Sequence, residues 1–347
     1  MRIKPPKNCL LENLGTDTLK KHLAKRTKTI AIVVHTNPDG DAIGSALGLY
    51  HYLLLLGFKQ VAVIAPNAYA SFLQWMPGND QVLIAENDMD LAQEQIMGAD
   101  ILFCLDFNGF ARAENLAPAL ETSKALKIII DHHPQPEAGF DVVFHDTKAS
   151  STAELVYLFI ELMGDKTLIN RNIAECLYAG IVTDTGSFSY GANHPRTYEI
   201  VARLMALGVD GSHIHRLIYS TYSPDRMRLL GFCLSERLVV KEALHTAFIS
   251  LSIEDMKRFN YQEGDTEGVV NYALAIKNIR LAALFMERDD HVKVSLRSTG
   301  SLDVNRLARQ YFQGGGHMNA AGGKTHQSLQ QSIEDFVAML QENKENL

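Results

Sequence analysis

Histidine and aspartate residues follow directly after three short apolar segments of the sequence. They are His35, Asp39 and Asp41 after residues 29–34, Asp106 after residues 101–105, and Asp131, His132 and His133 after residues 126–130. Their side chains offer only nitrogen and oxygen donors, which suit Mn²⁺ or a similar borderline divalent ion better than a soft, thiolate-preferring one. Zinc and iron stay open on this argument. The spacing therefore indicates a metal centre.

A further carboxylate closes the apolar segment 177–186, where Asp184 lies in the run Thr-Asp-Thr-Gly. The candidate metal ligands are then six residues: His35, Asp39, Asp41, Asp106, His132 and Asp184. Six ligands exceed what one catalytic ion with open coordination positions needs. Two ions, about 3.5–4 Å apart and bridged by a carboxylate, are the economical interpretation, and such pairs hydrolyse phosphate esters.

Each of these residues also has a structural explanation when it is taken alone. An aspartate before a turn is commonly a helix cap or a turn residue. Asp41 could cap the helix that follows it, and Asp131 could orient a neighbouring ligand instead of binding metal. The coincidence of several such residues at strand ends favours the metal centre for the set as a whole.

A glycine-rich run near the C-terminus is a second candidate for ligand binding. It contains Gly314, Gly315, Gly316 and His317. Its backbone amides can approach a phosphate closely, and His317 can donate from its side chain. A tight glycine-rich turn would explain the same run. Residues 323–325 resemble the tail of a P-loop, but Met318 stands where that motif needs glycine, which excludes a nucleoside triphosphatase.

The residues of the metal centre must be positioned by the elements that precede them. Four apolar segments predict buried strands: 29–34, 61–65, 101–105 and 126–130. Helical patterns lie between and after them, at 41–56, in part of 111–122, at 151–163 and at 172–182. This alternation predicts an α/β fold with a mainly parallel sheet. The carboxyl ends of parallel strands line one edge of a sheet, so the histidines and aspartates should meet there.

The second half of the chain predicts a helical connector and a smaller α+β domain. Residues 195–236 have a helical pattern with Pro195 and Pro224 as helix starts. Strands are expected at 244–251, 276–286 and 291–296, and helices at 305–312 and 328–342. Arg297 ends the last of these strands and could bind a phosphate through its planar fork, although an exposed strand-end arginine is a common feature. The expected domains are 1–194 and 237–347, joined by the connector 195–236.

Composition limits the class of protein and of substrate. The chain has 347 residues, of which 46% are hydrophobic, and this predicts two globular domains. A net charge of -7 argues against a basic track along long nucleic acid, so an anionic substrate should be small. Four separated cysteines, Cys9, Cys104, Cys176 and Cys233, suggest neither a zinc site nor a disulfide scaffold and fit a reducing cytoplasm. The apolar stretch 46–58 is too short to span a membrane.

Taken together, these motifs resemble those of the DHH phosphoesterase superfamily. The resemblance rests on the run from His35 to Asp41, on Asp106, on Asp131-His132-His133 and on the run around Asp184. The glycine-rich run with His317 is similar to the signature of the DHH-associated C-terminal domain. The match covers nearly the whole chain in the right order. Length and layout resemble the bifunctional oligoribonuclease and 3'-phosphoadenosine 5'-phosphate (pAp) phosphatase branch more than the longer RecJ exonucleases.

The resemblance implies roles for individual residues. One metal would be held by His35, Asp39 and Asp106, and a second by Asp41, Asp106, His132 and Asp184, with Asp106 as the bridge. Asp131 would support the neighbouring imidazole, and His133 would donate to the substrate phosphate, so that His133, Asp131 and Asp106 form the catalytic set. Substrate binding would involve Arg297, Gly314, Gly315, Gly316 and His317, on the second wall of an interdomain cleft. A homodimer is also implied.

The expected function is hydrolysis of short oligoribonucleotides or linear dinucleotides such as pApA to mononucleotides, together with removal of the 3' phosphate of pAp. Two divalent ions are expected, Mn²⁺ first, with Mg²⁺ or Co²⁺ as alternatives. The alternatives within the superfamily are a cyclic-dinucleotide phosphodiesterase and a pyrophosphatase or exopolyphosphatase. The absence of an Arg-Lys-Lys cluster argues against a pyrophosphatase. A nucleotide-binding regulatory protein without catalysis is the alternative from another class.

Overall fold

Two units divide the chain. The computed structural model describes residues 10–12 and 16–342, and its units are Met1–Thr221 and Tyr222–Leu347. The residues outside these described ranges include Cys9. Cys104, Cys176 and Cys233 are buried free thiols. Each unit has its own sheet and its own cores, as the apolar composition predicts.

The first unit contains a seven-stranded sheet in the order β1-β7-β6-β5-β2-β3-β4. Its strands are β1 (Leu10–Glu12), β2 (Ile30–Val34), β3 (Val61–Ala65), β4 (Val82–Ile84), β5 (Ile101–Leu105), β6 (Leu126–Asp131) and β7 (Val142–His145). All neighbours pair in parallel except β1, which runs antiparallel to β7. The strand order reverses between β2 and β5, and ligands of such sheets bind at this switch point. The predicted parallel sheet is confirmed.

Helices cover both faces of this sheet. On one face lie α1 (Thr16–Ala24), α2 (Gly40–Leu55), α5 (Thr152–Met163) and α6 (Arg171–Asp184), and on the other lie α3 (Met89–Met97), α4 (Ala117–Thr122) and the 3₁₀ segment η3 (Phe110–Leu116). Successive residues of a strand point to opposite faces of the sheet, so Ile32 of β2 packs in the core on one face and Val33 in the core on the other. Burial on both faces explains why these strands are uninterrupted apolar runs.

The helices after α6 belong to different units. In the first unit, α7 (Pro195–Ala206) and α8 (Gly211–Tyr219) add Ile200 and Ile214 to the core beneath α6. The second unit begins with α9 (Pro224–Phe232), which a π-helix (Cys233–Arg237) follows. Both α7 and α9 start at the predicted proline. Proline is tolerated there because the N–H that it lacks would have no hydrogen-bond partner within the helix.

The second unit contains a mixed six-stranded sheet in the order β12-β13-β11-β10-β9-β8. Its strands are β8 (Leu238–Lys241), β9 (Thr246–Leu251), β10 (Leu281–Glu287), β11 (Val292–Ser298), β12 (Gly315–Gly316) and β13 (Ala320–Thr325). One face packs on α12 (Val304–Tyr311) and α13 (Leu329–Glu342), and the other on α9, α10 (Ile253–Arg258) and α11 (Val269–Leu274). Among the described strands of this unit, only β9 and β10 pair in parallel, which confirms an α+β unit.

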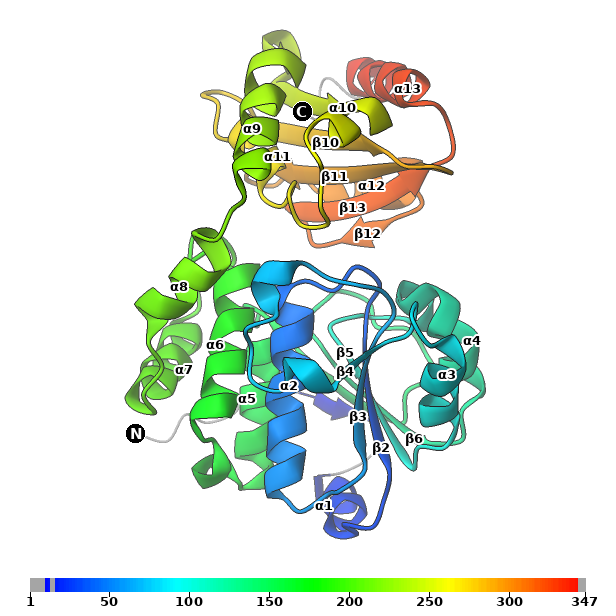
Figure 1. Ribbon diagram of the computed structural model, residues 1–347, viewed down its shortest axis with the longest axis vertical. Coiled ribbons are helices and arrows are strands. Elements are labelled where there is room, and N and C mark those ends of the chain that lie inside the picture. Colours follow the sequence, from blue (N-terminus) through cyan, green and yellow to red (C-terminus); the bar gives the residue numbers. More distant parts are fainter. Residues whose placement is uncertain (1–9, 13–15, 343–347) are drawn as a thin grey trace. The chain divides into compact units, whose positions relative to one another are not determined.

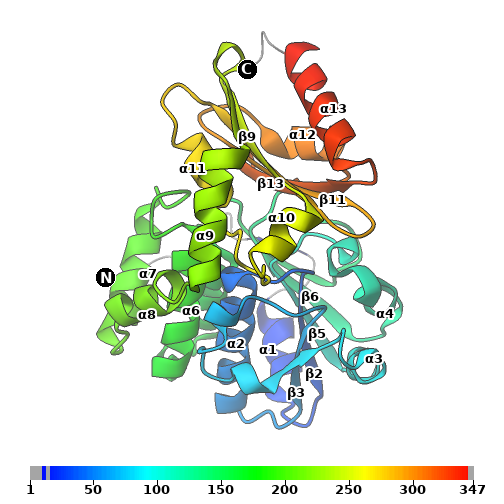
Figure 2. The ribbon, with the colours of Figure 1, turned by 45° about the horizontal axis from the view of Figure 1, so that its top comes forward.

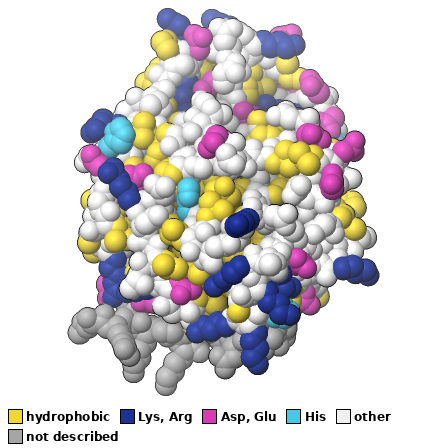
Figure 3. Space-filling model, turned by 60° about the horizontal axis from the view of Figure 1, so that its bottom comes forward, with side chains coloured by type: hydrophobic (Ala, Val, Ile, Leu, Met, Phe, Trp, Pro, Cys, Tyr) yellow, Lys and Arg dark blue, Asp and Glu magenta, His cyan; other side chains and the backbone are white. Residues whose placement is uncertain are grey.

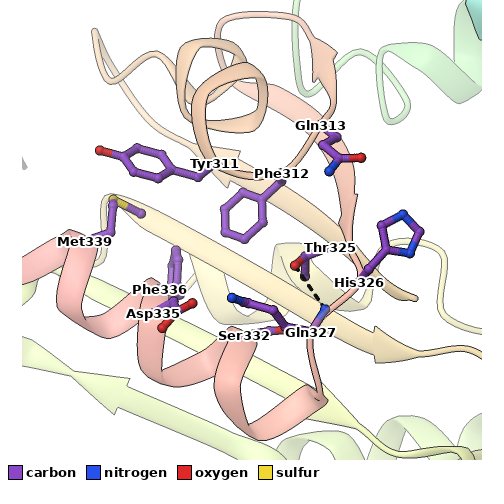
Figure 4. Close-up of a pocket in the computed structure, with 10 residues that line it drawn as sticks. All are labelled: Tyr311, Phe312, Gln313, Thr325, His326, Gln327, Ser332, Asp335, Phe336 and Met339. Carbon is purple, nitrogen blue, oxygen red and sulfur yellow. Dashed lines mark hydrogen bonds between the residues drawn. The ribbon is translucent and has the colours of Figure 1, made fainter. Parts of the chain in front are cut away.

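A groove of about 420 Å³ lies beside α13 in this unit. Figure 4 shows its lining, which comes from the end of α12, the residues after β13 and one side of α13. The rings of Phe312 and Phe336, 6.5 Å apart between centroids, lie at its base and belong to the core of the unit. The floor of the groove is therefore formed by two aromatic residues through which α12 and α13 pack against each other.

The end of the first unit that carries α1 is seen in Figure 3. Lys and Arg side chains gather near its lower edge and are otherwise mixed with apolar and acidic ones. Lys20, Lys25 and Arg26 are exposed on α1 and the turn after it, which leads into the amino end of β2. Five strand residues, about 15 Å, separate that end from the carboxyl edge of the sheet.

Among the described residues, no helix is both long and apolar enough to cross a bilayer.

Candidate metal centre

The carboxyl edge of the first sheet collects the chemically active side chains. His35 follows β2, Asp106 follows β5 and Asp131 ends β6, and these three strands are neighbours. Asp184 is the last residue of α6, and Asp41 lies in the first turn of α2. The structure therefore brings the strand-end residues together at the switch point of the sheet.

The backbone turns sharply where two of these strands end. Asn37 and Asp106 have φ values of 56° and 64°, a left-handed conformation that few non-glycine residues adopt. Beyond β2 the chain enters α2, whose N-cap is Asp39. Its Oδ1 accepts from the amides of Asp41 and Ala42 at 3.0 Å each. The capping role that the sequence leaves open for Asp41 thus belongs to Asp39.

His35, Asp39 and Asp106 form the first candidate ligand group. Their ligand atoms all lie within 4.8 Å of one another, and His35 Nε2 lies 3.5 Å from Asp106 Oδ2. His35 Nδ1 lies 2.9 Å from the Thr36 carbonyl oxygen, which can only accept, so the proton is on Nδ1. Burial lowers the pKa of His35. A neutral ring therefore turns the lone pair of Nε2 toward the carboxylates.

Asp41, His132 and Asp184 form the second candidate ligand group, and their ligand atoms also lie within 4.8 Å of one another. His132 Nε2 lies 3.6 Å from Asp184 Oδ2, 3.9 Å from Asp41 Oδ2 and 3.6 Å from Asp106 Oδ1. Its Nδ1 faces the Ala149 carbonyl oxygen at 3.3 Å. Burial lowers the pKa of His132 to about 4. Asp106 thus turns one oxygen toward each group.

The electrostatics of the cluster fit divalent cations. Burial raises the pKa of Asp106 well above its usual range, and the neighbouring Asp39 and Asp184 raise it further. The pKa of Asp41 is raised by burial and by Asp106. Adjacent buried carboxylates repel one another unless a positive charge lies between them. Neutral imidazoles and carboxylates are the donor set of a borderline divalent ion, and Cys104 of β5 points into the opposite core.

Comparison with known proteins identifies the family of the chain. The DHH family, N-terminal domain, matches residues 29–181, and the DHHA1 domain matches residues 243–346. A bifunctional oligoribonuclease and PAP phosphatase, NrnA, from Thermus thermophilus is 30% identical to the chain, over 84% of the chain and 83% of that protein. The chain belongs to the DHH phosphoesterase family.

Two further relatives cover most of this DHH protein. NrnA of Bacillus subtilis, also named a bifunctional oligoribonuclease and PAP phosphatase, is 28% identical over 86% of the chain and 90% of its own length. A crystal structure of an exopolyphosphatase-related protein from Bacteroides fragilis superposes with a TM-score of 0.88 at 41% identity, covering 95% of this chain and 96% of that one. The NrnA relatives are hydrolases, and this protein is a phosphoesterase of the same family.

The DHH motif itself places Asp131 beside His133. His133 Nδ1 lies 2.7 Å from Asp131 Oδ1 and 3.7 Å from Asp106 Oδ1. Asp131 therefore supports the second imidazole of the motif, whereas His132 is supported by a backbone carbonyl. Burial raises the pKa of Asp131 to about 6, while burial and the charge of Arg112 lower the pKa of His133 to about 3. With Nδ1 donating to the Asp131 carboxylate, Nε2 of His133 can donate a hydrogen bond only when the ring is protonated.

Arg112 is a residue of this site that the sequence did not reveal. It lies in η3, and its carbonyl oxygen accepts from the amide of Thr36 at 2.8 Å, next to His35. Its positive charge lowers the pKa values of both His35 and His133, after the larger effect of burial. The side chain is exposed. Arg112 is a single arginine six residues after Asp106. Its position in the sequence does not indicate that η3 brings it back next to His35.

In the second unit, the glycine-rich run forms the β12–β13 hairpin. A Cβ at Gly314 would overlap the carbonyl oxygen of Gly322, and one at Gly316, whose φ is 149°, would lie 2.5 Å from the Ala320 oxygen. Gly315 has more space. Close packing within the hairpin therefore accounts for two of the three glycines. A phosphate-binding role for the run stays a prediction.

The other two substrate-binding candidates lie close to the same hairpin. Arg297 is in β11, paired with Ala320 of β13, and its Nη1 donates to the Leu296 carbonyl at 3.0 Å. His317 occupies the turn between β12 and β13, where its amide donates to the Ala320 oxygen at 2.7 Å. The second unit thus gathers these candidates at one side of its sheet.

Close packing of α6 against Asp41 leads to a prediction for Gly180. A Cβ there would lie 2.6 Å from the Ala153 Cβ and 2.9 Å from Asp41 Oδ1. Alanine inside a helix is ordinarily better than glycine by about 1 kcal/mol. We nevertheless expect Gly180→Ala to lower the melting temperature and to reduce turnover roughly 10–100-fold, because it displaces a ligand carboxylate.

Gly231→Ala is the matched control, since a Cβ built at that position in α9 meets no described atom within 4 Å beyond its own stretch of helix. It should leave turnover unchanged. Thermal unfolding and steady-state rates of both variants test this, and a Gly180→Ala enzyme as active and as stable as the unmodified protein would contradict the packing argument.

Proposed function

We propose that the protein uses two divalent cations to hydrolyse linear dinucleotides and short oligoribonucleotides to mononucleotides, and to remove the 3' phosphate of pAp. The observation that carries the proposal is the pair of ligand groups that share Asp106. The activities for which the two NrnA relatives are named support the choice of substrates. Mn²⁺ is the first choice of metal, with Mg²⁺ or Co²⁺ as alternatives.

In this proposal His35, Asp39 and Asp106 hold one ion, and Asp41, Asp106, His132 and Asp184 hold the other. When bound, the two ions supply an activated water and neutralise charge on the phosphoryl oxygens. The carbonyl oxygens of Thr36 and Ala149 fix the tautomers of His35 and His132, so that both rings offer Nε2. No serine or cysteine nucleophile is required.

The remaining residues of the first unit act on the substrate. Asp131 orients His133, whose Nε2 donates to a phosphate oxygen in the imidazolium form. The negative charges of Asp131 and of a bound phosphate favour that form, whereas burial and Arg112 oppose it. Arg112 contributes a positive charge for the phosphate that is being attacked.

The second unit supplies the contacts that select a short nucleotide. We assign Arg297, His317 and the run 314–316 to the far phosphate or the terminal nucleotide. A net charge of -7 offers little attraction for a long polyanion. A homodimer and a cytoplasmic location, which the sequence analysis expects, stay predictions alongside this assignment.

Hydrolysis of four substrates side by side tests the proposed function. In Mn²⁺ buffer, the protein should turn over 5'-pApA and pAp rapidly and act slowly or not at all on a 24-nucleotide RNA and on pyrophosphate. Chelation with EDTA should abolish both activities, and added Mn²⁺ should restore them. A cyclic dinucleotide serves as the fifth sample for the phosphodiesterase alternative.

Each alternative gives a different outcome. Faster hydrolysis of pyrophosphate, or of polyphosphate, would replace the nucleotide substrates and keep the metal centre. Faster hydrolysis of the cyclic dinucleotide would favour the phosphodiesterase. Binding of pApA without any hydrolysis in excess Mn²⁺ would favour the nucleotide-binding regulatory protein, the only alternative without catalysis.

Arg112→Ala should mainly weaken substrate binding. A charged hydrogen bond to phosphate contributes about 1.5–3 kcal/mol, so we expect KM for pAp to rise roughly 10–100-fold with a smaller change in kcat. Arg171→Ala removes an exposed arginine that pairs with Glu175 on the surface of the same unit, and it should leave KM unchanged. An unchanged KM in the Arg112 variant would exclude it from the substrate site.

A further inference from the structure

The segment 146–154, which includes the first turn of α5, contacts three of the candidate metal ligands. The amides of Thr152 and Ala153 donate to the two carboxylate oxygens of Asp41, at 2.6 and 2.8 Å. Asp41 has no exposed surface, so these two amides define how its carboxylate lies. The amides at the start of a helix lack helical partners and are suited to hold an anion.

The hydroxyl of Thr152 reaches the shared ligand. Its Oγ1 donates to Asp106 Oδ1 at 2.9 Å, and both side chains are buried. This is the oxygen that faces His132, whereas Oδ2 of Asp106 faces His35. The hydroxyl therefore donates to the carboxylate oxygen of Asp106 that faces the second ligand group.

His132 is the third ligand tied to this segment. The carbonyl oxygen of Ala149, three residues before Thr152, faces its Nδ1 at 3.3 Å and leaves Nε2 for the second group. Asp41, His132 and one oxygen of Asp106 are thus all oriented by one stretch of chain. His35 and Asp39 are oriented by other parts of the described chain, namely the Thr36 carbonyl and the start of α2.

A buried ion pair fixes the segment itself. Glu154 has no exposed surface and accepts from the amide and hydroxyl of Ser150 at 3.1 and 2.7 Å, and from Thr197 Oγ1 at 2.7 Å. Arg196 Nε donates to Glu154 at 2.5 Å, and its Nη2 donates to Asp146 at 3.1 Å. Arg196 therefore joins the two ends of the segment, which leaves the backbone around Thr152 little freedom to shift.

From these contacts we infer that Thr152 is a positioning residue that selectively supports the second metal site, the one formed by Asp41, Asp106, His132 and Asp184. Its hydroxyl holds Asp106 Oδ1 in place and its amide holds Asp41. The first site, with His35 and Asp39, uses the other oxygen of Asp106, Oδ2, so its affinity should change little when the hydroxyl is removed. The inference rests on the two-ion function proposed above.

Titration of the metal-free protein with Mn²⁺, followed by electron paramagnetic resonance, tests this without measuring activity. Loss of an outer hydrogen bond to a metal ligand typically weakens metal binding 10–100-fold. The isosteric Thr152→Val variant should bind one Mn²⁺ as the unmodified protein does and the second roughly 10–100-fold more weakly. At two equivalents, the signal of a coupled pair should give way to the six-line signal of isolated Mn²⁺.

Two variants control for the loss of a buried hydroxyl. Thr152→Ser keeps the donor and should restore binding of the second ion. Thr246→Val removes another buried threonine hydroxyl, which donates to the Leu244 carbonyl in the second unit, and it should leave both Mn²⁺ affinities unchanged. If Thr152→Val does not fold, as judged by circular dichroism, Thr152→Ala removes the same hydroxyl and is titrated in its place.

The outcomes separate this inference from the proposed function. Two Mn²⁺ ions in the unmodified protein and unchanged, or equally weakened, binding of both in Thr152→Val would overturn the selective role of Thr152 alone. Fewer than two bound ions in the unmodified protein would overturn the two-ion assignment and this inference with it.

Discussion

Asp106→Asn should reduce hydrolysis of pAp and pApA by roughly 10³-fold or more. Asp106 turns Oδ2 toward His35 and Oδ1 toward His132, so it is the one ligand that both groups share. An amide lacks the negative charge and one of the two acceptor oxygens that a bridge needs. Since bound ions contribute several kcal/mol of charge stabilisation in the transition state, the loss of either ion has an effect of this size.

The same substitution should raise the melting temperature of the metal-free protein. Burial and nearby carboxylates hold the pKa of Asp106 well above its usual range, so its ionised form opposes folding at neutral pH. Replacing it with a neutral amide relieves that repulsion. Steady-state rates and thermal unfolding in EDTA measure the two effects. An active Asp106→Asn enzyme would exclude a shared ligand, and a lower melting temperature in EDTA would contradict the electrostatic account.

Arg196→Ala should produce the largest loss of stability. It leaves the carboxylate of Glu154 buried with only neutral donors, and removal of one partner of a buried ion pair costs about 3–5 kcal/mol. For a unit of this size, that lowers the melting temperature by roughly 6–20 °C. The double variant Arg196→Met, Glu154→Leu removes both charges and should be less destabilised than Arg196→Ala alone.

Arg203→Ala provides the comparison on the same helix. Arg203 is partly exposed, and its Nη1 lies 3.4 Å from Glu161 Oε1. An ion pair of this kind contributes about 1 kcal/mol or less to the free energy of unfolding. Calorimetry or urea unfolding of the three variants measures the differences. A melting temperature of Arg196→Ala within roughly 2–4 °C of the unmodified protein, the shift expected for about 1 kcal/mol, would contradict a structural role for the buried pair.

The strands that carry the site were predictable because each is buried on both faces. β3 and β5 have the predicted bounds, and β2 and β6 differ from them by one residue. Parallel strands bring the residues at their carboxyl ends to one edge of the sheet, which is why His35, Asp106 and Asp131 could be placed together from the sequence alone. The alternation of strands and helices, more than any single motif, made that inference sound.

Strands of other composition were missed. β13 has the sequence Ala-Ala-Gly-Gly-Lys-Thr, whose small residues have low strand propensity and whose glycines suggest a turn. It forms because glycines let the β12 backbone approach closely. The predicted strand 276–286 begins only at Leu281, because Asn278, with a φ of 67°, lies in a turn before it. In both cases tertiary packing, which the local sequence pattern does not show, determines where the strand lies.

The hydrogen bonds that hold the candidate metal ligands in place could not be predicted from the sequence. Thr152 and Asp106 are 46 residues apart and meet through a single hydrogen bond, and Arg196 of α7 bonds to both Asp146 and Glu154. A lone threonine at a helix start or a lone arginine near a proline has no distinctive spacing. Such contacts depend on how helices pack on the sheet, and periodicity does not specify that.

The most direct test of the two-ion centre is an anomalous difference map from crystals soaked in Mn²⁺. We predict two peaks per chain, one among His35, Asp39 and Asp106, and the other among Asp41, Asp106, His132 and Asp184. A single peak, or peaks away from the carboxyl edge of the first sheet, would contradict the account.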